Sequence, residues 1–101
     1  MIFVYSTFPT KKEAKRIGEE LVKLKLAACV NIFPIDSIFF WRGEIVKDKE
    51  LGVFIKTKKE NFKKIERFIL KKHSYTTPCI LEIPLGKISK RYLNWLKETI
   101  A

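Results

Sequence analysis

Histidine, cysteine and glycine are scarce in this 101-residue sequence, which has one, two and four of them, respectively. Cys29 and Cys79 stand fifty positions apart and belong to no C-x-x-C pair. We therefore expect free, buried thiols in a cytoplasmic protein rather than a disulfide framework. The sequence also lacks a glycine-rich phosphate loop and a recognisable pairing of nucleophile and base, so we do not expect an enzyme.

Long hydrophobic runs and biased segments are absent as well. No stretch approaches the roughly 20 apolar residues of a membrane-spanning helix, so no membrane partner is expected. No internal repeat, linker or low-complexity segment interrupts the chain, which predicts a single domain over residues 1–101. Hydrophobic residues make up 47% and charged residues 32% of the sequence, a composition typical of folded proteins.

Basic residues outnumber acidic ones by 21 to 11, which gives a formal net charge of +10. Such a charge admits nucleic acid, an anionic membrane surface or acidic ligands as partners. A surface rich in lysine and glutamate is also common in heat-adapted proteins and needs no ligand to explain it. The charge alone does not decide between these readings.

The most distinctive stretch runs from Ala27 to Lys58, where we expect two long strands joined by a turn at Arg42-Gly43. The first strand carries β-branched and aromatic residues at nearly every second position. Pro34 predicts a bend or a sheet edge, and Gly52 predicts a bulge. Straight arms of roughly fifteen residues would reach about 50 Å, so the arms must bend or a partner must cover them.

The rest of the chain reads as short elements on either side of this hairpin. We expect strands over residues 2–8 and 79–85. The pattern Thr-Lys-Lys-Glu occurs at Thr10–Glu13 and again at Thr57–Glu60, and it predicts a capping box at the start of two helices. Their apolar faces would be formed by Ala14, Ile17, Leu21, Val22 and Leu24 in the first helix and by Phe62, Ile65, Phe68 and Ile69 in the second.

A last helix is expected after Ser89, a good N-cap residue, held by Tyr92, Trp95, Leu96 and Ile100. The resulting β-α-β-β-α-β order with a C-terminal helix predicts an α+β fold, the ferredoxin-like sandwich with an antiparallel sheet. Two helices can cover only one face of that sheet. Apolar residues are nevertheless expected on the other face, so self-association is the physical inference. The residues we place there are Phe3, Tyr5, Cys29, Phe54 and Ile80.

Several ordered motifs identify a family that this chain resembles. They are LAACVNIFP, FFWRGEI, IKT before the second helix, H-x-Y-x-x-P before the last strand, and YLNWL near the end. Together they resemble the CutA divalent-cation-tolerance proteins, from Val4 to Leu96. The resemblance implies a ferredoxin-like subunit in a homotrimer, similar in assembly to the PII signalling proteins. It also implies tolerance to divalent metals, with copper(II) or another divalent cation as ligand and no cofactor required for folding.

The family's shared polar cluster can be carried over onto this chain residue by residue. Cys29 and His73 would be the metal ligands, and the other positions would frame a ligand site: Trp41, Glu44, Lys56 and Tyr75. Copper contacts proposed for some bacterial members use a cysteine in the first strand and histidines just before the H-x-Y motif. This chain has Ser6 and Lys72 at two of those positions and retains only His73.

Each of these residues also has a structural reading. His73 suits a helix C-terminus and could be hydrogen-bonded there rather than bind a metal. Cys29 could simply pack among small residues. Trp41 is typical of an interface anchor, while Glu44 and Lys56 could pair with each other or frame a small anionic ligand pocket between subunits.

Two other functional classes remain as alternatives. A PII-like sensor would bind a metabolite or metal between subunits and act through a second, unidentified protein. An RNA-recognition module shares the strand order, but its third-strand signature is poorly matched by Glu50–Ile55. The lysine-rich stretches lie mainly on the expected outer helix faces, so we do not expect a nucleic-acid partner.

Overall fold

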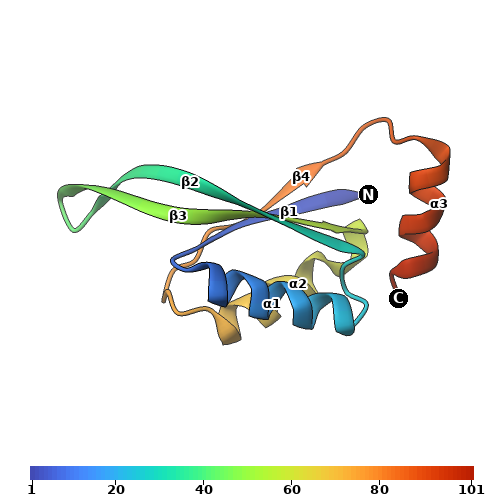
Figure 1. Ribbon diagram of the computed structural model, residues 1–101, viewed down its shortest axis with the longest axis horizontal. Coiled ribbons are helices and arrows are strands. Elements are labelled where there is room, and N and C mark those ends of the chain that lie inside the picture. The colour runs from blue at the N-terminus through green and yellow to red at the C-terminus, as the bar shows by residue number, and fades with distance from the viewer.

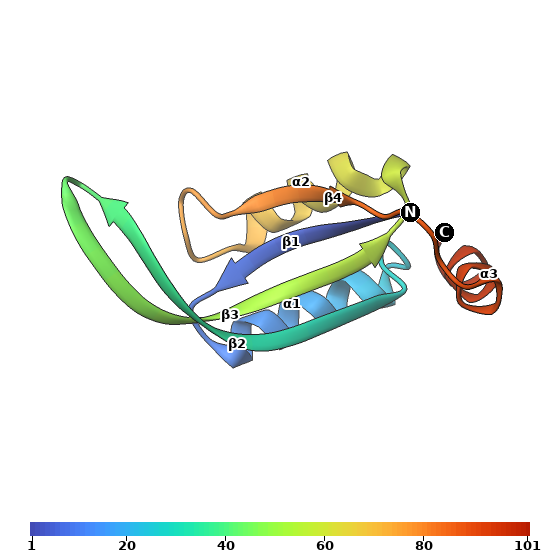
Figure 2. The ribbon, with the colours of Figure 1, turned by 90° about the horizontal axis from the view of Figure 1, so that it is seen from above.

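The computed structural model describes residues 1–101 as one antiparallel sheet with two helices on one face and a third at one end (Figure 1). The strands are β1 (Ile2–Phe8), β2 (Cys29–Trp41), β3 (Glu44–Thr57) and β4 (Ile80–Pro84), in the spatial order β2-β3-β1-β4 (Figure 2). The helices are α1 (Lys11–Lys23), α2 (Phe62–Lys72) and α3 (Lys90–Thr99). The predicted ferredoxin-like α+β fold is therefore confirmed.

The main core lies between the sheet and helices α1 and α2. Alternate residues of β1 and β3 point into it, because successive side chains of a strand face opposite sides. The core residues of the two strands and two helices are all almost fully buried: Ile2, Val4, Phe8, Val53, Ile55, Ala14, Ile17, Leu21, Ile65 and Ile69. Val22 and Leu24 were predicted on this face and are instead exposed, at 39% and 56%.

Both predicted capping boxes need correction. At α1 the Thr10 hydroxyl accepts the Glu13 N–H at 3.2 Å as expected, but the Glu13 carboxylate turns away and accepts the Ser74 N–H at 3.1 Å. At α2 there is no box. Thr57 is the last residue of β3, its hydroxyl donates to the Leu26 carbonyl at 2.6 Å, and a short 3₁₀ turn, Lys59–Asn61, precedes the helix.

The hairpin of β2 and β3 has the predicted turn but not the predicted bulge. Arg42 and Gly43 both have positive φ, 52° and 80°, as a tight two-residue hairpin turn requires. Pairing continues without interruption from Trp41–Glu44 to Cys29–Lys56, so Gly52 causes no bulge. The missing side chain of Gly52 leaves room for the Phe33 ring instead, because a Cβ at Gly52 would lie 2.6 Å from that ring. Pro34 sits on the edge strand β2, as predicted.

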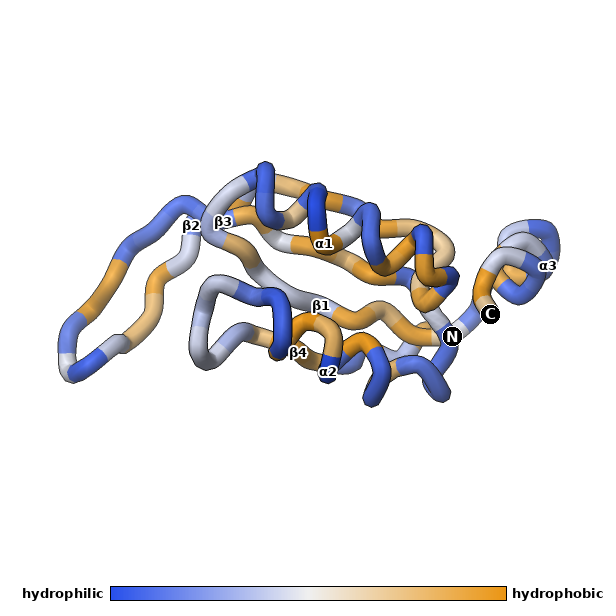
Figure 3. The backbone as a smooth tube through the Cα atoms, turned by 90° about the horizontal axis from the view of Figure 1, so that it is seen from below, coloured by the Kyte–Doolittle hydropathy of each residue, from blue (hydrophilic) through white to orange (hydrophobic).

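The hairpin projects beyond the helices and curves (Figures 1 and 2). β1 pairs with β3 only as far as Leu51, so residues 35–50, here called the outer half of the hairpin, form a two-stranded ribbon. Hydrophobic segments lie in both of its arms (Figure 3). Its large exposed apolar residues are Ile38, Phe39, Phe40, Trp41 and Ile45. The chain reaches 45 Å along its longest axis, so the arms both bend and project.

The sheet face opposite α1 and α2 is apolar and largely uncovered, as predicted. Phe54 lies at its centre, with ring centroids of Phe3, Tyr5 and Phe33 at 4.9, 5.7 and 5.0 Å. Ile80 was predicted on this uncovered face, and that prediction was wrong. It pairs with Ser6 and packs against the main core, because residues that pair across strands share a face.

Helix α3 covers one end of the molecule rather than the open face (Figure 1). Leu96 and Ile100 pack with Ala28 in a small second core. Tyr92 and Trp95 were predicted to hold this helix down, yet they are 37% and 42% exposed and contact each other with ring centroids 5.4 Å apart. None of the three helices is long and apolar enough to span a membrane.

Candidate functional site

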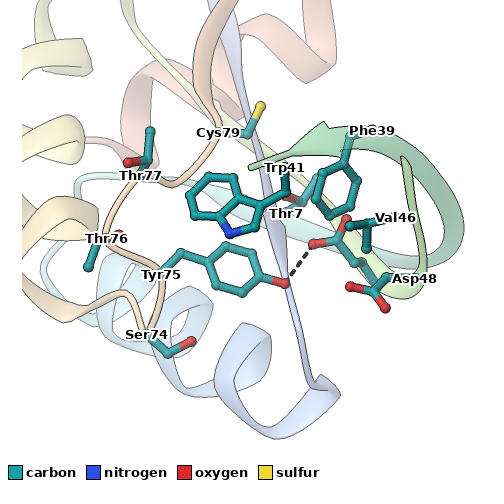
Figure 4. A pocket seen from close by; sticks show the side chains of 11 residues that line it. Thr7, Phe39, Trp41, Val46, Asp48, Ser74, Tyr75, Thr76, Thr77 and Cys79 are labelled. Atoms are coloured by element: carbon teal, nitrogen blue, oxygen red, sulfur yellow. Dashed lines mark hydrogen bonds between the residues drawn. The ribbon is translucent and has the colours of Figure 1, made fainter. Parts of the chain in front are cut away.

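A cavity of about 550 Å³ lies between the outer half of the hairpin and the segment that links α2 to β4 (Figure 4). The hairpin supplies one wall and residues 74–79 supply the other, with β1 contributing between them. The lining residues are Thr7, Phe39, Trp41, Val46, Asp48, Glu50, Ser74, Tyr75, Thr76, Thr77 and Cys79. We call this space the hairpin cavity.

Glu50 and Tyr75 connect the two walls of the hairpin cavity. Glu50 is only 8% exposed, and its carboxylate accepts the Tyr75 hydroxyl proton at 2.8 Å (Figure 4). Burial raises the pKa of Tyr75 well above its usual value, and the hydrogen bond to Glu50 raises it further. Trp41 projects from the hairpin into the same space as the Tyr75 ring.

All charged residues that line the hairpin cavity are acidic. Asp48 lies on an exposed part of its rim and Glu50 lies inside, while no lysine, arginine or histidine lines it. Burial, followed by the charge of Glu50, raises the pKa of the Cys79 thiol, and burial also raises the pKa of Tyr5 nearby. The cavity is therefore a negatively charged site in a protein whose net charge is +10.

His73 lies behind the hairpin cavity with both ring nitrogens engaged. Nε2 lies 2.7 Å from the Thr7 carbonyl oxygen, and Nδ1 accepts the Tyr75 N–H at 2.9 Å. Nε2 must carry the proton, because a carbonyl oxygen can only accept. The side chain is fully buried and its ring stacks on Phe8 at 4.4 Å. Neither nitrogen offers a free lone pair to a metal in this arrangement, so the geometry favours the structural reading of His73.

Cys29 and Lys56 lie together at the other end of the sheet. They are opposite each other in the β2–β3 pairing. The Lys56 ammonium donates to the Tyr92 hydroxyl at 3.0 Å, which raises the pKa of Lys56, and the Cys29 thiol makes only a long 3.8 Å contact with Asn31. Cys29 and His73 are therefore not brought together within one chain.

Glu44 is exposed at the hairpin turn, opposite Trp41. Glu44 is the first residue of the 14-residue strand β3, and Lys56 is the last but one. At about 3.3 Å per residue they lie roughly 40 Å apart, so they neither pair nor frame one pocket within a chain. Of the six predicted site residues, only Trp41 and Tyr75 share a cavity, with His73 positioned directly behind Tyr75.

Ser6, for which the resemblance implied a cysteine in some bacterial members, has a hydroxyl that is already hydrogen-bonded. Ser6 is fully buried, and its Oγ donates to the Cys79 carbonyl at 2.7 Å. No group of three or more histidine, cysteine, aspartate or glutamate side chains could hold a metal ion within the chain.

Sequence reasoning missed Asp48, Glu50 and Cys79. In the segment Lys47-Asp48-Lys49-Glu50 the charges alternate, which normally indicates a solvated strand. The same alternation places both acids on one face of β3 and both lysines on the other. That signal was present in the sequence, but only the fold brings residues 74–79 against the acidic face.

Comparison with known proteins establishes the family. The family model described as "CutA1 divalent ion tolerance protein" matches residues 2–99. This chain belongs to the CutA1 family. It is 46% identical over 98 residues to the divalent-cation tolerance protein CutA of Archaeoglobus fulgidus, covering 97% of this chain and 96% of that protein. The corresponding protein of Thermotoga maritima is 42% identical over 100 residues, and the match covers 99% of this chain and 99% of that protein.

Solved CutA structures have the same fold. The structure described as the periplasmic divalent cation tolerance protein CutA from Archaeoglobus fulgidus superimposes with a TM-score of 0.97 at 45% identity, over all of both chains. CutA1 from Pyrococcus horikoshii superimposes with a TM-score of 0.96 at 33% identity, covering 100% of this chain and 99% of that one. The projecting hairpin and C-terminal helix are thus parts of the CutA1 fold rather than additions to it.

Proposed function

We propose that this protein acts in divalent-cation tolerance as a homotrimer that binds a divalent cation or a small ligand at clefts between its subunits. The observation that carries the proposal is the CutA1 family match over residues 2–99, nearly the whole chain. The family is named for divalent-cation tolerance, not for a reaction, and we expect no catalysis. A cytoplasmic location fits the two free cysteines, Cys29 and Cys79.

The uncovered apolar surface supports assembly. Five large apolar residues of the outer half of the hairpin are between 39% and 72% exposed, and the face around Phe54 has no helix over it. Large apolar residues exposed in such number are typical of protein interfaces. A second and third copy of the chain would cover it, and the same contacts would bring side chains of different subunits together.

Metal ligands would then have to come from different subunits. Within one chain His73 is committed to backbone partners, while the Cys29 thiol has only one long contact. Thiolate and imidazole suit copper, and carboxylates such as those of Asp48 and Glu50 suit harder divalent cations. The proposal names copper(II) or another divalent cation, with Cys29 and His73 as the predicted ligands, and His73 would have to give up one of its two hydrogen bonds to bind the ion.

A copper(II) titration by calorimetry, on protein whose assembly is established by sedimentation, tests the proposal. We expect a trimer and saturable binding of about one ion per chain. Cys29→Ser and His73→Ala test the two predicted ligands, and the adjacent exposed Lys72 supplies the control, Lys72→Ala. Loss of the site in one ligand variant alone identifies that ligand. A chain that is not trimeric, or that binds neither copper nor zinc nor nickel saturably, would overturn the proposal.

A PII-like sensor is the second candidate function, and one observation favours it. The hairpin cavity has a volume of about 550 Å³, which lies in the range of small-molecule sites and far exceeds one ion. A sensor of this type would bind a metabolite and transmit the event to a second protein. Capture of a partner that depends on an added metabolite would distinguish it from a protein that only holds metal.

A further inference from the structure

We propose that the hairpin cavity binds a small organic cation, a primary ammonium or guanidinium compound that carries an apolar group. The inference rests on the small-ligand form of the proposed function and names the chemical class of the ligand. Its site is defined by Glu50, Asp48, Trp41 and Tyr75.

The first argument is the unbalanced charge of Glu50. Its carboxylate is almost fully buried, accepts one hydrogen bond, from Tyr75, and forms no ion pair. Burying a charge without an opposite partner is costly. The chain has 21 lysines and arginines, yet none lines this cavity. A bound cation would supply the missing positive charge, with Asp48 at the rim as a second carboxylate.

The second argument concerns why the cation is organic. Phe39, Trp41 and Tyr75 line the cavity, and a cation near the face of an aromatic ring is stabilised by it. A metal ion would find no set of three ligands here. Burial raises the pKa of the Cys79 thiol, which disfavours the thiolate that a metal would bind. Ammonium and guanidinium groups need only hydrogen-bond acceptors, which carboxylates provide.

The third argument is size and lining. A volume of about 550 Å³ holds a small organic molecule with room beyond its charged group. Val46 and Phe39 provide apolar surface in the lining, while the hydroxyls of Thr7 and Thr77 provide further acceptors. An amphiphilic cation matches both parts of the cavity, whereas an anion would meet Glu50 and Asp48 with no basic group to receive it.

The test uses the assembled protein and three probes of similar shape. Calorimetric titration with 2-phenylethylammonium should show saturable binding. The neutral 2-phenylethanol and the anionic 3-phenylpropionate should bind at least tenfold more weakly. Glu50→Gln should weaken binding of the ammonium at least tenfold, and Asp48→Asn about threefold. Asp36→Asn removes an exposed carboxylate on the opposite side of the same hairpin, outside the cavity, and should leave binding unchanged.

Three results would overturn the inference. In the first, 2-phenylethylammonium does not bind. In the second, 2-phenylethanol binds as tightly as the ammonium. In the third, Glu50→Gln binds the ammonium as tightly as the unaltered chain does. Asp48→Asn lies at an exposed rim and should fold normally, so it keeps the test decisive if Glu50→Gln does not fold. Copper binding by a trimer that does not bind the ammonium would overturn this inference and leave the proposed function standing, whereas loss of the trimer would overturn the proposed function.

Discussion

The base and the outer half of the hairpin are built from the same two strands but have opposite surroundings. At the base, Val53 and Ile55 are each 1% exposed under the helices. In the outer half, Ile38 and Ile45 are 71% and 64% exposed. The pairing of β2 with β3 is continuous through both parts. Backbone pairing therefore extends the hairpin beyond the core. We expect the apolar side chains of the outer half to contact another molecule.

The two parts also differ in how they are attached to the body. The base pairs with β1 and packs on two helices. The outer half makes a single side-chain hydrogen bond to the body, from Tyr75 to Glu50. An isolated two-stranded ribbon is at best marginally stable in water. We therefore expect mutations at the base to act on folding and mutations in the outer half to act on assembly.

The largest effect is expected from truncating a core residue at the base. Ile55→Ala should lower the free energy of unfolding by about 3 kcal/mol, because it removes buried methylene groups and leaves a cavity. Ile45→Ala makes the same change in the outer half and should cost under about 0.5 kcal/mol. Guanidinium unfolding at a fixed protein concentration compares them. Equal losses would show that the assembled protein covers the outer half as thoroughly as the base.

Removing the aromatic side chain at the tip should have the next largest effect. Trp41→Ala is expected to weaken assembly by about 2 kcal/mol, or about 30-fold, because exposed aromatic anchors dominate interfaces. Leu70→Ala, on α2, is the matched control, since Leu70 is 54% exposed and Trp41 49%. Sedimentation over a concentration series measures the change. We also expect copper binding to change less than assembly. A trimer unaffected by Trp41→Ala would count against the hairpin as the assembly device.

The smallest effect at neutral pH is expected from cutting the link between the two parts. Tyr75→Phe should cost about 1 kcal/mol, because Glu50 loses its hydrogen-bond donor. The pH dependence is more informative. Folding raises the pKa of Tyr75, so the folded chain holds this proton after the unfolded chain has lost it. Stability is therefore complete below about pH 10, the unfolded value, and falls as the pH rises beyond it.

Unfolding measured between about pH 8 and pH 11 tests this dependence. The unaltered protein should lose stability more steeply above pH 10 than Tyr75→Phe, which has no phenol to titrate at this position. Tyr5 and Cys79 also have raised pKa values and contribute a decline of the same sign that the variant keeps. Equally steep curves would show that folding does not raise the pKa of Tyr75.

The elements that depend on local sequence could be predicted. Strand β1, the Arg42-Gly43 turn and the first helix followed from alternation, turn chemistry and an N-cap threonine. The second capping box failed because Thr57 is used elsewhere. Its hydroxyl donates to the Leu26 carbonyl, 31 residues away, and Asn61 contacts the same carbonyl. A local pattern cannot show that a distant backbone group will claim its side chain.

The candidate site was predictable only in part, for the same reason. Trp41 and Tyr75 were identified as site residues and do share a cavity. Glu50 was not, because a glutamate in a strand of alternating charges normally faces water. Its burial depends on the curve of the hairpin and on the path of residues 74–79, both of which are properties of the fold. Glu44 and Lys56 do not pair within one chain because the length of β3 separates them, and a pocket that they frame between subunits stays a prediction.

The alternation of Lys47, Asp48, Lys49 and Glu50 gives the ribbon two electrically different sides. One side of β3 is cationic and the other anionic along this stretch. On the cationic side Lys49 lies directly opposite Asp36 of β2, and on the anionic side Glu50 is buried in the hairpin cavity. Lys47 and Asp48 are therefore the exposed charges of this stretch that have no opposite charge across the β2–β3 pairing, one on each side. A molecule that approaches the ribbon thus meets a different charge on each of its two sides.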